Sequence, residues 1–361
     1  MSDHYVLAIN PGSTSTKIAV YQGETLLFEK GMSHDSSVVA QYSTNIAQFP
    51  MRKEAILKAL AEENFPLEKL GAVAGRGGKT PPLKCGAYLV TKGMIDFLVN
   101  TPIDDHASNL GAPLAFEIAA PLGIPAYIYD AVVVDELEDI ARYTGVPQMT
   151  RRASCHVLNM RAVALKTAQK YGRSFQDLNF VVCHMGGGIT ATVISRGRMI
   201  DTLTDEEGAF SPERAGGVPC RQLVDLCFSG QYNRTEATKL MRGQGGLVAY
   251  LGTNSALEVE KRIAAGDSRA ELVYSAMAYQ TAKGIGGLAT VLKGGVDYIV
   301  LTGALAKSAR FLDQVKERIA FIAPLEIWPG EDELEALARG ALRVLRGQED
   351  YSTFTKPDRA A

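Results

Sequence analysis

Two short stretches of small and polar residues could hold phosphate groups. The first runs from Pro11 to Thr16 as PGSTST, and the second, GGGIT, begins at Gly186. Backbone N–H groups and hydroxyls in such turns, here those of Ser13 and Ser15, form a concave donor surface that suits phosphate oxygens. The alternative is that each stretch is an ordinary hairpin turn, in which glycine and serine are also favoured.

An offset of 174 residues relates the two stretches and lays FVVCHMGGGITATVISRGRMI over VLAINPGSTSTKIAVYQGETL without a gap. The coinciding identical pairs are Gly12 with Gly186, Thr16 with Thr190, and Gly23 with Gly197. Both copies have the pattern of strand, small-residue loop, strand, glycine turn and strand. We therefore predict a duplicated domain, with two polar loops that face each other across a cleft.

Apolar periodicity indicates a mixed α/β fold. Helices are predicted over residues 53–64, 161–171, 271–292, 307–322 and 333–345, and strands over 5–10, 16–21, 25–29, 126–128, 180–183 and 298–302. The offset divides the chain into a first domain over residues 1–149 and a second over residues 150–332. A C-terminal helix within residues 333–361 is expected to pack back on the first domain. The polar tail after Asp350 is expected to fray.

Composition narrows the class of protein. With 361 residues, the chain is long enough for two domains and a sizeable core. Lys and Arg number 38 against 40 acidic residues, so neither nucleic acid nor an anionic membrane is favoured as a partner. The five cysteines are irregularly spaced, which argues against a disulfide framework or structural zinc. Because no leader or membrane-spanning run is found, a cytoplasmic protein with small-molecule partners is expected.

Two common nucleotide-binding motifs do not fit. GRGGKT, residues 75–80, ends like a Walker A loop, but Val73 stands where that motif needs its first glycine. The stretch at Gly186 lacks the spacing of a dinucleotide-binding turn, and it follows a hairpin strand instead of entering a helix. A P-loop NTPase and a dinucleotide-binding protein are therefore disfavoured.

The motifs together resemble those of the acetate and butyrate kinases of the sugar kinase, Hsp70 and actin superfamily. The resemblance rests on INPGSTSTKIAVY, GRGG, HASNLGAPLA, YIYDAVVVDEL, RRASCH, CHMGGGIT, EGAFSPERAGGVP, LTGALAKS and PGEDELEALA, which spread from residue 9 to residue 340. It implies two duplicated actin-like (ribonuclease H-like) domains around a central cleft. It also implies reversible transfer of the γ-phosphoryl group of ATP to a short-chain fatty acid such as butyrate, giving an acyl phosphate and ADP, with Mg²⁺ as cofactor and a homo-oligomeric enzyme.

Such a reaction needs cations and hydrogen-bond donors more than a base. The carboxylate nucleophile is already ionised, so catalysis consists of aligning two anions and neutralising the transferred group. Arg76 and Arg214 lie in glycine-rich turns from which a guanidinium can reach carboxylate or phosphoryl oxygens. His106, His156 and His184 lie in matching motifs, and His184 ends a strand just before the glycine loop. The alternatives are solvated arginines and structural histidines, above all for His156, and a phosphohistidine intermediate is not required.

Magnesium usually takes one or two carboxylates and several waters. Asp130, at a predicted strand end, and Asn10, beside the first loop, are candidate ligands. A third candidate is Glu333, although the sequence does not separate it from Glu331 and Asp332. These three acids could instead serve only as favourable charge at a helix N-terminus.

The resemblance also implies nucleotide contacts. The candidates are Asn10, Ser13, Ser15, Lys17, Gly186, Gly187, Gly188, Gly303, Ala304 and Lys307. The last three lie in a strand, glycine turn and helix pattern that carries adenosine in this superfamily.

Two departures from the acetate kinase pattern bear on the substrate. Acetate kinases carry a valine two residues after the equivalent of Arg76 and a phenylalanine just before the equivalent of His156, whereas this chain has Gly78 and Cys155. Smaller walls leave room for extra methylene groups, so a four-carbon or branched acid is expected to bind better than acetate. The choice among butyrate, isobutyrate and propionate stays open. So do a sugar kinase with Asp130 as base and a non-catalytic actin-like ATP-binding module.

Overall fold

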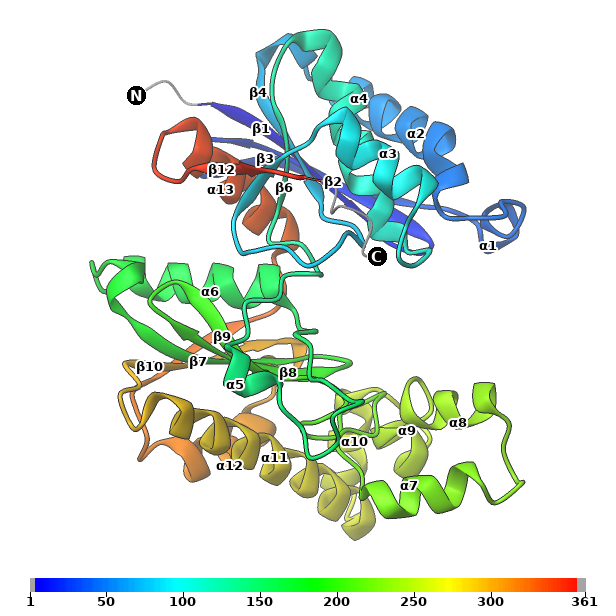
Figure 1. Cartoon of the computed structure of the whole chain (residues 1–361), viewed down its shortest axis with the longest axis vertical. Coiled ribbons are helices and arrows are strands. Elements are labelled where there is room, and N and C mark those ends of the chain that lie inside the picture. The colour runs from blue at the N-terminus through cyan, green and yellow to red at the C-terminus, as the bar shows by residue number, and fades with distance from the viewer. Residues whose placement is uncertain (1–3, 356–361) are drawn as a thin grey trace. The chain divides into compact units, whose positions relative to one another are not determined.

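The computed structural model describes residues 4–355, which form two compact units (Figure 1). Unit 1 comprises the chain up to Asp135 and again from Asp332, and unit 2 comprises Glu136–Glu331. The division lies earlier than the boundary expected at residue 149, because the chain after Asp135 already attaches to strand β9 (Arg198–Leu203) of unit 2. The N–H group of Met199 donates to Glu136 Oε2 over 3.0 Å.

Each unit is built on one β-sheet. The sheet of unit 1 has the order β12-β5-β6-β4-β1-β2-β3, and that of unit 2 has the order β11-β10-β7-β8-β9. The strands of unit 1 are β1 (Tyr5–Pro11), β2 (Ser15–Gln22), β3 (Thr25–Ser33), β4 (Leu70–Arg76), β5 (Ala87–Leu89), β6 (Ala126–Tyr129) and β12 (Tyr351–Thr353). The other strands of unit 2 are β7 (Asn179–Met185), β8 (Ile189–Ser195), β10 (Tyr298–Gly303) and β11 (Leu325–Pro329).

The two sheets share one topology over five strands, β6-β4-β1-β2-β3 in unit 1 and β11-β10-β7-β8-β9 in unit 2. This confirms the duplicated α/β fold, and β1 and β7 coincide at the predicted offset of 174 residues. Beyond the loops the pairing differs by one residue, since Pro11 lies opposite Thr16 whereas Met185 lies opposite Ile189. Loop 12–15 is therefore one residue longer than loop 186–188.

Helices cover both faces of each sheet (Figure 1). Those of unit 1 are α1 (Ser36–Val39), α2 (Phe49–Glu62), α3 (Lys92–Asn100), α4 (Gly111–Ala119) and α13 (Glu333–Leu345). Those of unit 2 are α5 (Asp139–Arg142), α6 (Val157–Lys170), α7 (Cys220–Cys227), α8 (Arg234–Met241), α9 (Gly246–Leu251), α10 (Ala256–Ala264), α11 (Ser268–Ala289) and α12 (Ala309–Ile319). The helices predicted from periodicity correspond to α2, α6, α11, α12 and α13.

In unit 1, α2 and α4 pack on one face of the sheet and α13 on the other. Alternation along β1 puts Leu7 in the core beneath α2 and α4, and Ala8 on the face of α13. Gly340 allows α13 to approach closely, since a Cβ there would lie 2.5 Å from the ring of Tyr129 in β6. Residues 356–361 of the segment in which the C-terminal helix was expected lie outside the described residues.

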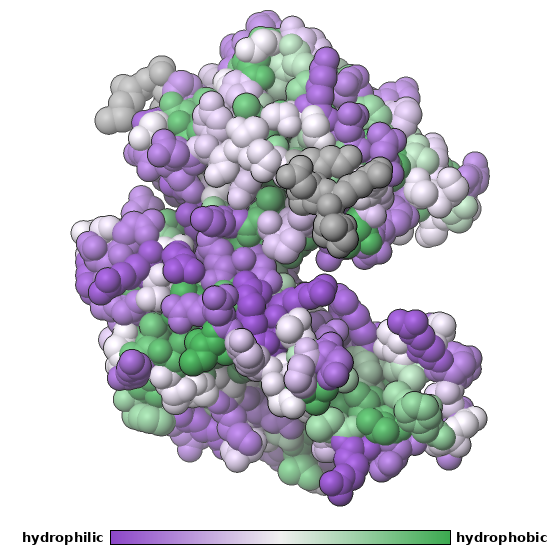
Figure 2. Space-filling view, viewed as in Figure 1, coloured by the Kyte–Doolittle hydropathy of each residue, from purple (hydrophilic) through white to green (hydrophobic). Residues whose placement is uncertain are grey.

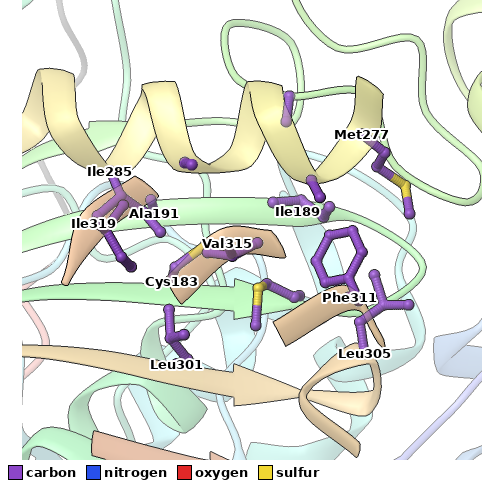
Figure 3. Close-up of a cluster of buried hydrophobic side chains, with 14 of the residues drawn as sticks. Cys183, Ile189, Ala191, Met277, Ile285, Leu301, Leu305, Phe311, Val315 and Ile319 are labelled. Carbon is purple, nitrogen blue, oxygen red and sulfur yellow. The ribbon is translucent and has the colours of Figure 1, made fainter. Parts of the chain in front are cut away.

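Figure 3 shows the core of unit 2, where α11 and α12 pack on β7, β8 and β10. Cys183 of β7, Leu301 of β10 and Phe311 of α12 meet there, each at most 1% exposed. Burial raises the pKa of the Cys183 thiol to about 12, so this cysteine is a protonated, apolar core residue. Because side chains alternate along β7, His184 points to the opposite face, which α6 covers.

The tail after Asp350 begins with an ordered strand, contrary to expectation. β12 pairs parallel with β5. Phe354 is 7% exposed, and its ring centroid lies 5.6 Å from that of Phe97. The buried aromatic side chain of Phe354 thus holds the tail in place, although the composition of the tail is mostly polar.

The surface of the described residues is mixed in character. None of their helices is both long and apolar enough to cross a membrane. On the face shown in Figure 2, hydrophilic side chains lie among smaller apolar areas in both units.

We expect Gly340→Ala to destabilise unit 1, because the added Cβ would overlap the Tyr129 ring. Overpacking of this kind costs about 1–3 kcal/mol and would lower the thermal or urea unfolding midpoint. Gly287→Ala is the matched control, since this helical glycine of α11 is exposed and an added Cβ would have no neighbour within 4 Å. It should be neutral or gain about 0.5–1 kcal/mol. Equal losses in both variants would contradict the packing of α13 described above.

Candidate functional site

Three predicted residues meet in unit 1. Asn10 is the penultimate residue of β1, Arg76 ends β4 and Glu333 begins α13. Asn10 Nδ2 donates to Glu333 Oε2 over 2.5 Å, and Arg76 Nη1 forms an ion pair with Glu333 Oε1. The Arg76 side chain is 14% exposed, and its buried Nε has no hydrogen-bond partner among the described residues. The cluster therefore offers a carboxylate, an amide and a guanidinium with an unused donor.

Of the three acids that the sequence left open, Glu333 is the one that joins this cluster. Glu331 lies in unit 2, where its Oε1 is 3.0 Å from His184 Nε2. As the first residue of α13, Glu333 also lies where the helix dipole favours negative charge. The oxygen atoms of Asn10 and Glu333 suit Mg²⁺. Among residues 4–355 there is no group of three or more His, Cys, Asp or Glu side chains that could hold a metal.

Loop 12–15 begins two residues after Asn10. The N–H group of Gly12 donates to Ser15 O over 2.8 Å and closes the turn. Ser13 is exposed, and so is Lys17 of β2, which lies opposite Asn10 in the hairpin. The hydroxyl of Ser13 and the ammonium of Lys17 are therefore accessible to an anion at this loop.

His106 and Asp130 have local partners in unit 1. His106 is exposed and precedes the short 3₁₀ helix η3 (Ala107–Leu110), where its Nδ1 accepts from the N–H group of Ser108 over 3.2 Å. Asp130 is 1% exposed, and its Oδ1 accepts from the N–H group of Gly86 over 2.8 Å. Its backbone has a φ of 43°, which is uncommon for a residue other than glycine. These contacts favour a structural role for Asp130 in the turn after β6, and its part in metal binding stays a prediction.

The two predicted histidines of unit 2 stack on each other. The rings of His156 and His184 are 3.8 Å apart and inclined by 12°. His184 Nδ1 lies 2.9 Å from Asn159 Oδ1, which assigns the proton to this nitrogen, and His156 Nδ1 lies 3.0 Å from Thr190 Oγ1. Among the described residues, His184 Nε2 forms no hydrogen bond, although Glu331 Oε1 lies 3.0 Å away. Asn159 was not among the residues predicted from the sequence, although it lies three residues after His156 and on the same face of α6.

Loop 186–188 passes close to these histidines. A Cβ at Gly186 would lie 2.9 Å from His184 Nε2, so a larger residue would press on that nitrogen. Gly187 O accepts from Ser211 Oγ over 2.7 Å and from the N–H group of Glu213 over 3.1 Å. The carbonyl group of Gly187 thus points toward Ser211 and Glu213. The glycine side of the loop, which has no side chains, faces the stacked rings of His156 and His184.

The end of β10, the neighbour of β7 in the sheet, also leaves no room for a larger side chain. Gly303 ends β10 with a φ of 91°, and a Cβ there would lie 2.5 Å from Met185 O, just before loop 186–188. Ala304 and Lys307 belong to the 3₁₀ helix η7 (Ala304–Lys307) and are exposed. The predicted adenosine-binding residues therefore lie at the same edge of the sheet as the loop.

Acidic side chains orient Arg214. Its Nε donates to Asp205 Oδ2 over 3.2 Å, and its Nη1 lies 3.4 Å from Glu213 Oε2. The side chain is 19% exposed, and its Cγ lies 4.0 Å from the position of a Cβ on Gly188. The guanidinium is thus fixed beside loop 186–188 and still partly accessible.

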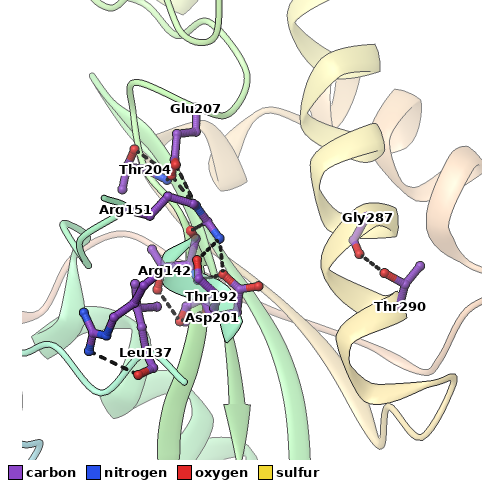
Figure 4. Close-up of polar contacts among 11 residues, drawn as sticks. Leu137, Arg142, Arg151, Thr192, Asp201, Thr204, Glu207, Gly287 and Thr290 are labelled. Carbon is purple, nitrogen blue, oxygen red and sulfur yellow. Dashed lines mark hydrogen bonds and ion pairs between the residues drawn. The ribbon is translucent and has the colours of Figure 1, made fainter. Parts of the chain in front are cut away.

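Arg151, which the sequence reasoning missed, secures the turn that carries Asp205 (Figure 4). Its Nε donates to Glu207 Oε1 over 2.7 Å, its Nη1 to Asp201 Oδ1 over 3.0 Å, and its Nη2 to Thr202 O over 2.5 Å. The guanidinium therefore ties β9 to the following turn on both sides of Asp205. Its position in the motif RRASCH is the feature by which it could have been identified from the sequence.

The structure corrects the expectation of open space at Gly78. A Cβ there would lie 2.8 Å from Asn109 Oδ1 and 3.0 Å from Leu98 Cδ2. Asn109 is held in place because its Oδ1 also accepts from the N–H group of Lys79 over 2.8 Å. Asn109 thus takes the space next to Gly78. Cys155, which is half-buried, remains as the departure that could widen an acyl pocket.

Known proteins share this architecture. A model of the acetokinase family matches residues 140–327, more than half of the chain. The acetate kinase of Porphyromonas gingivalis matches with a TM-score of 0.76 and 19% identity, covering 95% of this chain and 100% of that chain. The acetate kinase of Entamoeba histolytica (0.73, 16%) and a propionate kinase of Francisella tularensis subsp. tularensis (0.71, 17%) each cover 93% of this chain and 98% of their own. At these identities the structural likeness shows the two-domain actin-like fold alone.

We expect Arg151→Met to loosen the turn that carries Asp205. The N–H groups of Glu207 and Gly208 donate to Thr204 O, and they should exchange with deuterium about tenfold faster or more once Glu207 loses its partner. Arg152→Met is the control, because Arg152 is the exposed neighbour. Unchanged exchange in Arg151→Met would show that the turn does not depend on this guanidinium.

Proposed function

Because the chain belongs to the acetokinase family, we propose that it transfers the terminal phosphoryl group of ATP reversibly to a short-chain carboxylic acid. The products are the acyl phosphate and ADP. The observation that carries the proposal is the cluster in unit 2, where His184, stacked on His156, and Arg214 both border loop 186–188. Imidazole and guanidinium donors beside a loop of glycines suit the oxygens of a phosphoryl group.

The reaction balances without a proton transfer. A carboxylate oxygen attacks the γ-phosphorus, the bond from that phosphorus to the bridging oxygen breaks, and the electron pair leaves with ADP. A short-chain acid has a pKa of about 4–5, near that of a glutamate side chain, so it is ionised at neutral pH. The protein must then bring two anions together and neutralise the charge on the transferred group.

The side chains divide this work by charge. Arg214, oriented by Asp205, is placed to contact oxygens of the transferred group. His184 holds its Nδ1 proton toward Asn159 and directs Nε2 to the loop side, where it can donate when protonated. In unit 1, Arg76 supplies a planar pair of donors for the substrate carboxylate. Its Nη1 forms an ion pair with Glu333.

Asn10 and Glu333 would hold Mg²⁺ in this proposal. Their oxygens form a small hard donor set, which leaves the remaining positions of an octahedral ion to water and phosphate oxygens. The bound ion would neutralise charge on the β- and γ-phosphates. The carboxylate of Glu333 is positioned for this by the amide of Asn10 and by Arg76.

We further propose butyrate or a branched four-carbon acid as the preferred substrate. Cys155 supports this preference, because it is smaller than the phenylalanine of acetate kinases and leaves room for methylene groups worth about 0.8 kcal/mol each on burial. Gly78 gives no further support, since Asn109 fills the space beside it.

Arg214→Ala should abolish most activity while ADP binding persists. With ATP, Mg²⁺, acid and hydroxylamine, the wild type should form a hydroxamate, which only an acyl phosphate can give. Loss of one charged transition-state contact should lower kcat by about 10²–10³-fold. Arg221→Ala, at an exposed position of α7, is the control. Sugar phosphorylation without any hydroxamate would favour a hydroxyl kinase, and nucleotide binding with neither product would favour a non-catalytic module.

The chain-length preference is tested by kcat/KM over straight and branched acids of two to six carbons. Wild type should prefer four carbons to two by about tenfold or more. Cys155→Phe should reverse this ranking by filling the pocket. Gly78→Val should instead lower thermal stability, because its side chain meets Asn109 and Leu98. Equal kcat/KM for acetate and butyrate in the wild type would rule out the enlarged pocket.

A further inference from the structure

Arg52 is a fully buried arginine that the proposed reaction has not yet used. It lies in α2 of unit 1 and is 0% exposed. No carboxylate of the described residues forms an ion pair with it. Burial lowers the pKa of its guanidinium, although an arginine side chain stays charged at neutral pH. A buried charge without a counter-ion is costly, so its contacts call for explanation.

All five N–H donors of this guanidinium are used, and the contacts converge on loop 12–15. Nη1 donates to Ser15 O over 2.7 Å and to Thr16 Oγ1 over 3.0 Å, and Nη2 donates to Ser13 O over 2.9 Å. Gln48 Oε1 accepts the remaining two, from Nε over 3.0 Å and from Nη2 over 2.7 Å. Each acceptor is neutral, so the positive charge stays uncompensated.

These contacts fix the direction of the loop amides. In a trans peptide the N–H group points away from the C=O group of the preceding residue. With Ser13 O drawn to Arg52, the N–H group of Thr14 points to the other side of the loop. Thr14 O accepts from the N–H group of His34, directly after β3, over 2.8 Å, so the N–H group of Ser15 points away from β3. Among the described residues, no acceptor is found for the N–H groups of Ser13 and Thr14, and both residues are exposed.

We propose that Arg52 is a positioning residue for polyphosphate. It holds the carbonyls of Ser13 and Ser15 on the inner side, so that the N–H group of Thr14 faces a phosphate group, and its uncompensated charge strengthens the attraction of this loop for anions. The inference rests on the proposed function, because it takes loop 12–15 as the phosphate contact of unit 1. It adds a residue that touches neither substrate nor metal.

The two parts of this role, geometry and charge, can be tested separately. Gln48→Glu places a carboxylate against Nε and Nη2 without disturbing the bonds to Ser13 O and Ser15 O, so it neutralises the charge and leaves the geometry. Arg52→Lys keeps the charge but cannot hold both carbonyls. Lys58→Gln is the control, since Lys58 is an exposed cation of the same helix.

Affinities of the full-length protein for ADP, pyrophosphate and adenosine are measured by calorimetry, with thermal midpoints in parallel. Gln48→Glu and Arg52→Lys should each weaken ADP and pyrophosphate by about tenfold and leave adenosine unchanged. Gln48→Glu should at the same time match or exceed the wild-type midpoint, because it pairs a buried charge. A purely structural arginine predicts no loss of affinity in Gln48→Glu.

Several outcomes would overturn the inference. One is ADP affinity that is unchanged in both variants, and another is an equal loss for adenosine and ADP. If the wild type binds no nucleotide, the proposed function fails and this inference fails with it. If ADP binding falls as expected but no acid yields an acyl phosphate, the role of Arg52 stands and the proposed function falls.

Discussion

Both candidate clusters depend on a strand that is hydrogen bonded on both sides. β1 lies between β2 and β4, and β7 lies between β8 and β10. Because the backbone donors and acceptors of such a strand are paired along most of its length, the side chains near its end have fixed directions. Asn10 and His184 hold these positions. The loop that follows leaves the sheet, and in unit 1 the N–H groups of Ser13 and Thr14 have no acceptor among the described residues.

The two units carry different side chains at equivalent positions. In unit 1, the ends of β1 and β4 and the start of α13 carry Asn10, Arg76 and Glu333. In unit 2, the end of β7 and the start of α6 carry His184 and His156. α6, which comes after β6 in the chain, packs on β7 and β10, and α13, which comes after β11, packs on β1 and β4. The cluster in unit 1 is rich in side-chain oxygen atoms, and the cluster in unit 2 is rich in imidazole rings.

The duplication and the helices α2, α6, α11, α12 and α13 could be predicted from the sequence, because apolar periodicity reports burial directly, whereas α3, α4 and α7–α10 were not predicted. Prediction failed where a contact between distant segments decided the outcome. Gly78 was expected to border a cavity, but Asn109, far along the chain, fills it. Phe354 gave no periodic signal and still anchors the tail. Arg52 appeared as an ordinary helical arginine, since only the folded hairpin brings Ser13 O and Ser15 O to it.

The ungapped alignment of the two repeats also pairs residues whose side chains lie on opposite faces of their sheets. Loop 186–188 is one residue shorter than loop 12–15, so the aligned threonines Thr16 and Thr190 are not equivalent in the sheets. A slip of one residue moves a side chain to the opposite face. Thr16 accordingly faces α2 and meets Arg52, whereas Thr190 faces α6 and meets His156. The longer loop therefore places Lys17, and not Thr16, opposite Asn10, so that a cation instead of a hydroxyl stands next to the amide proposed to hold the metal.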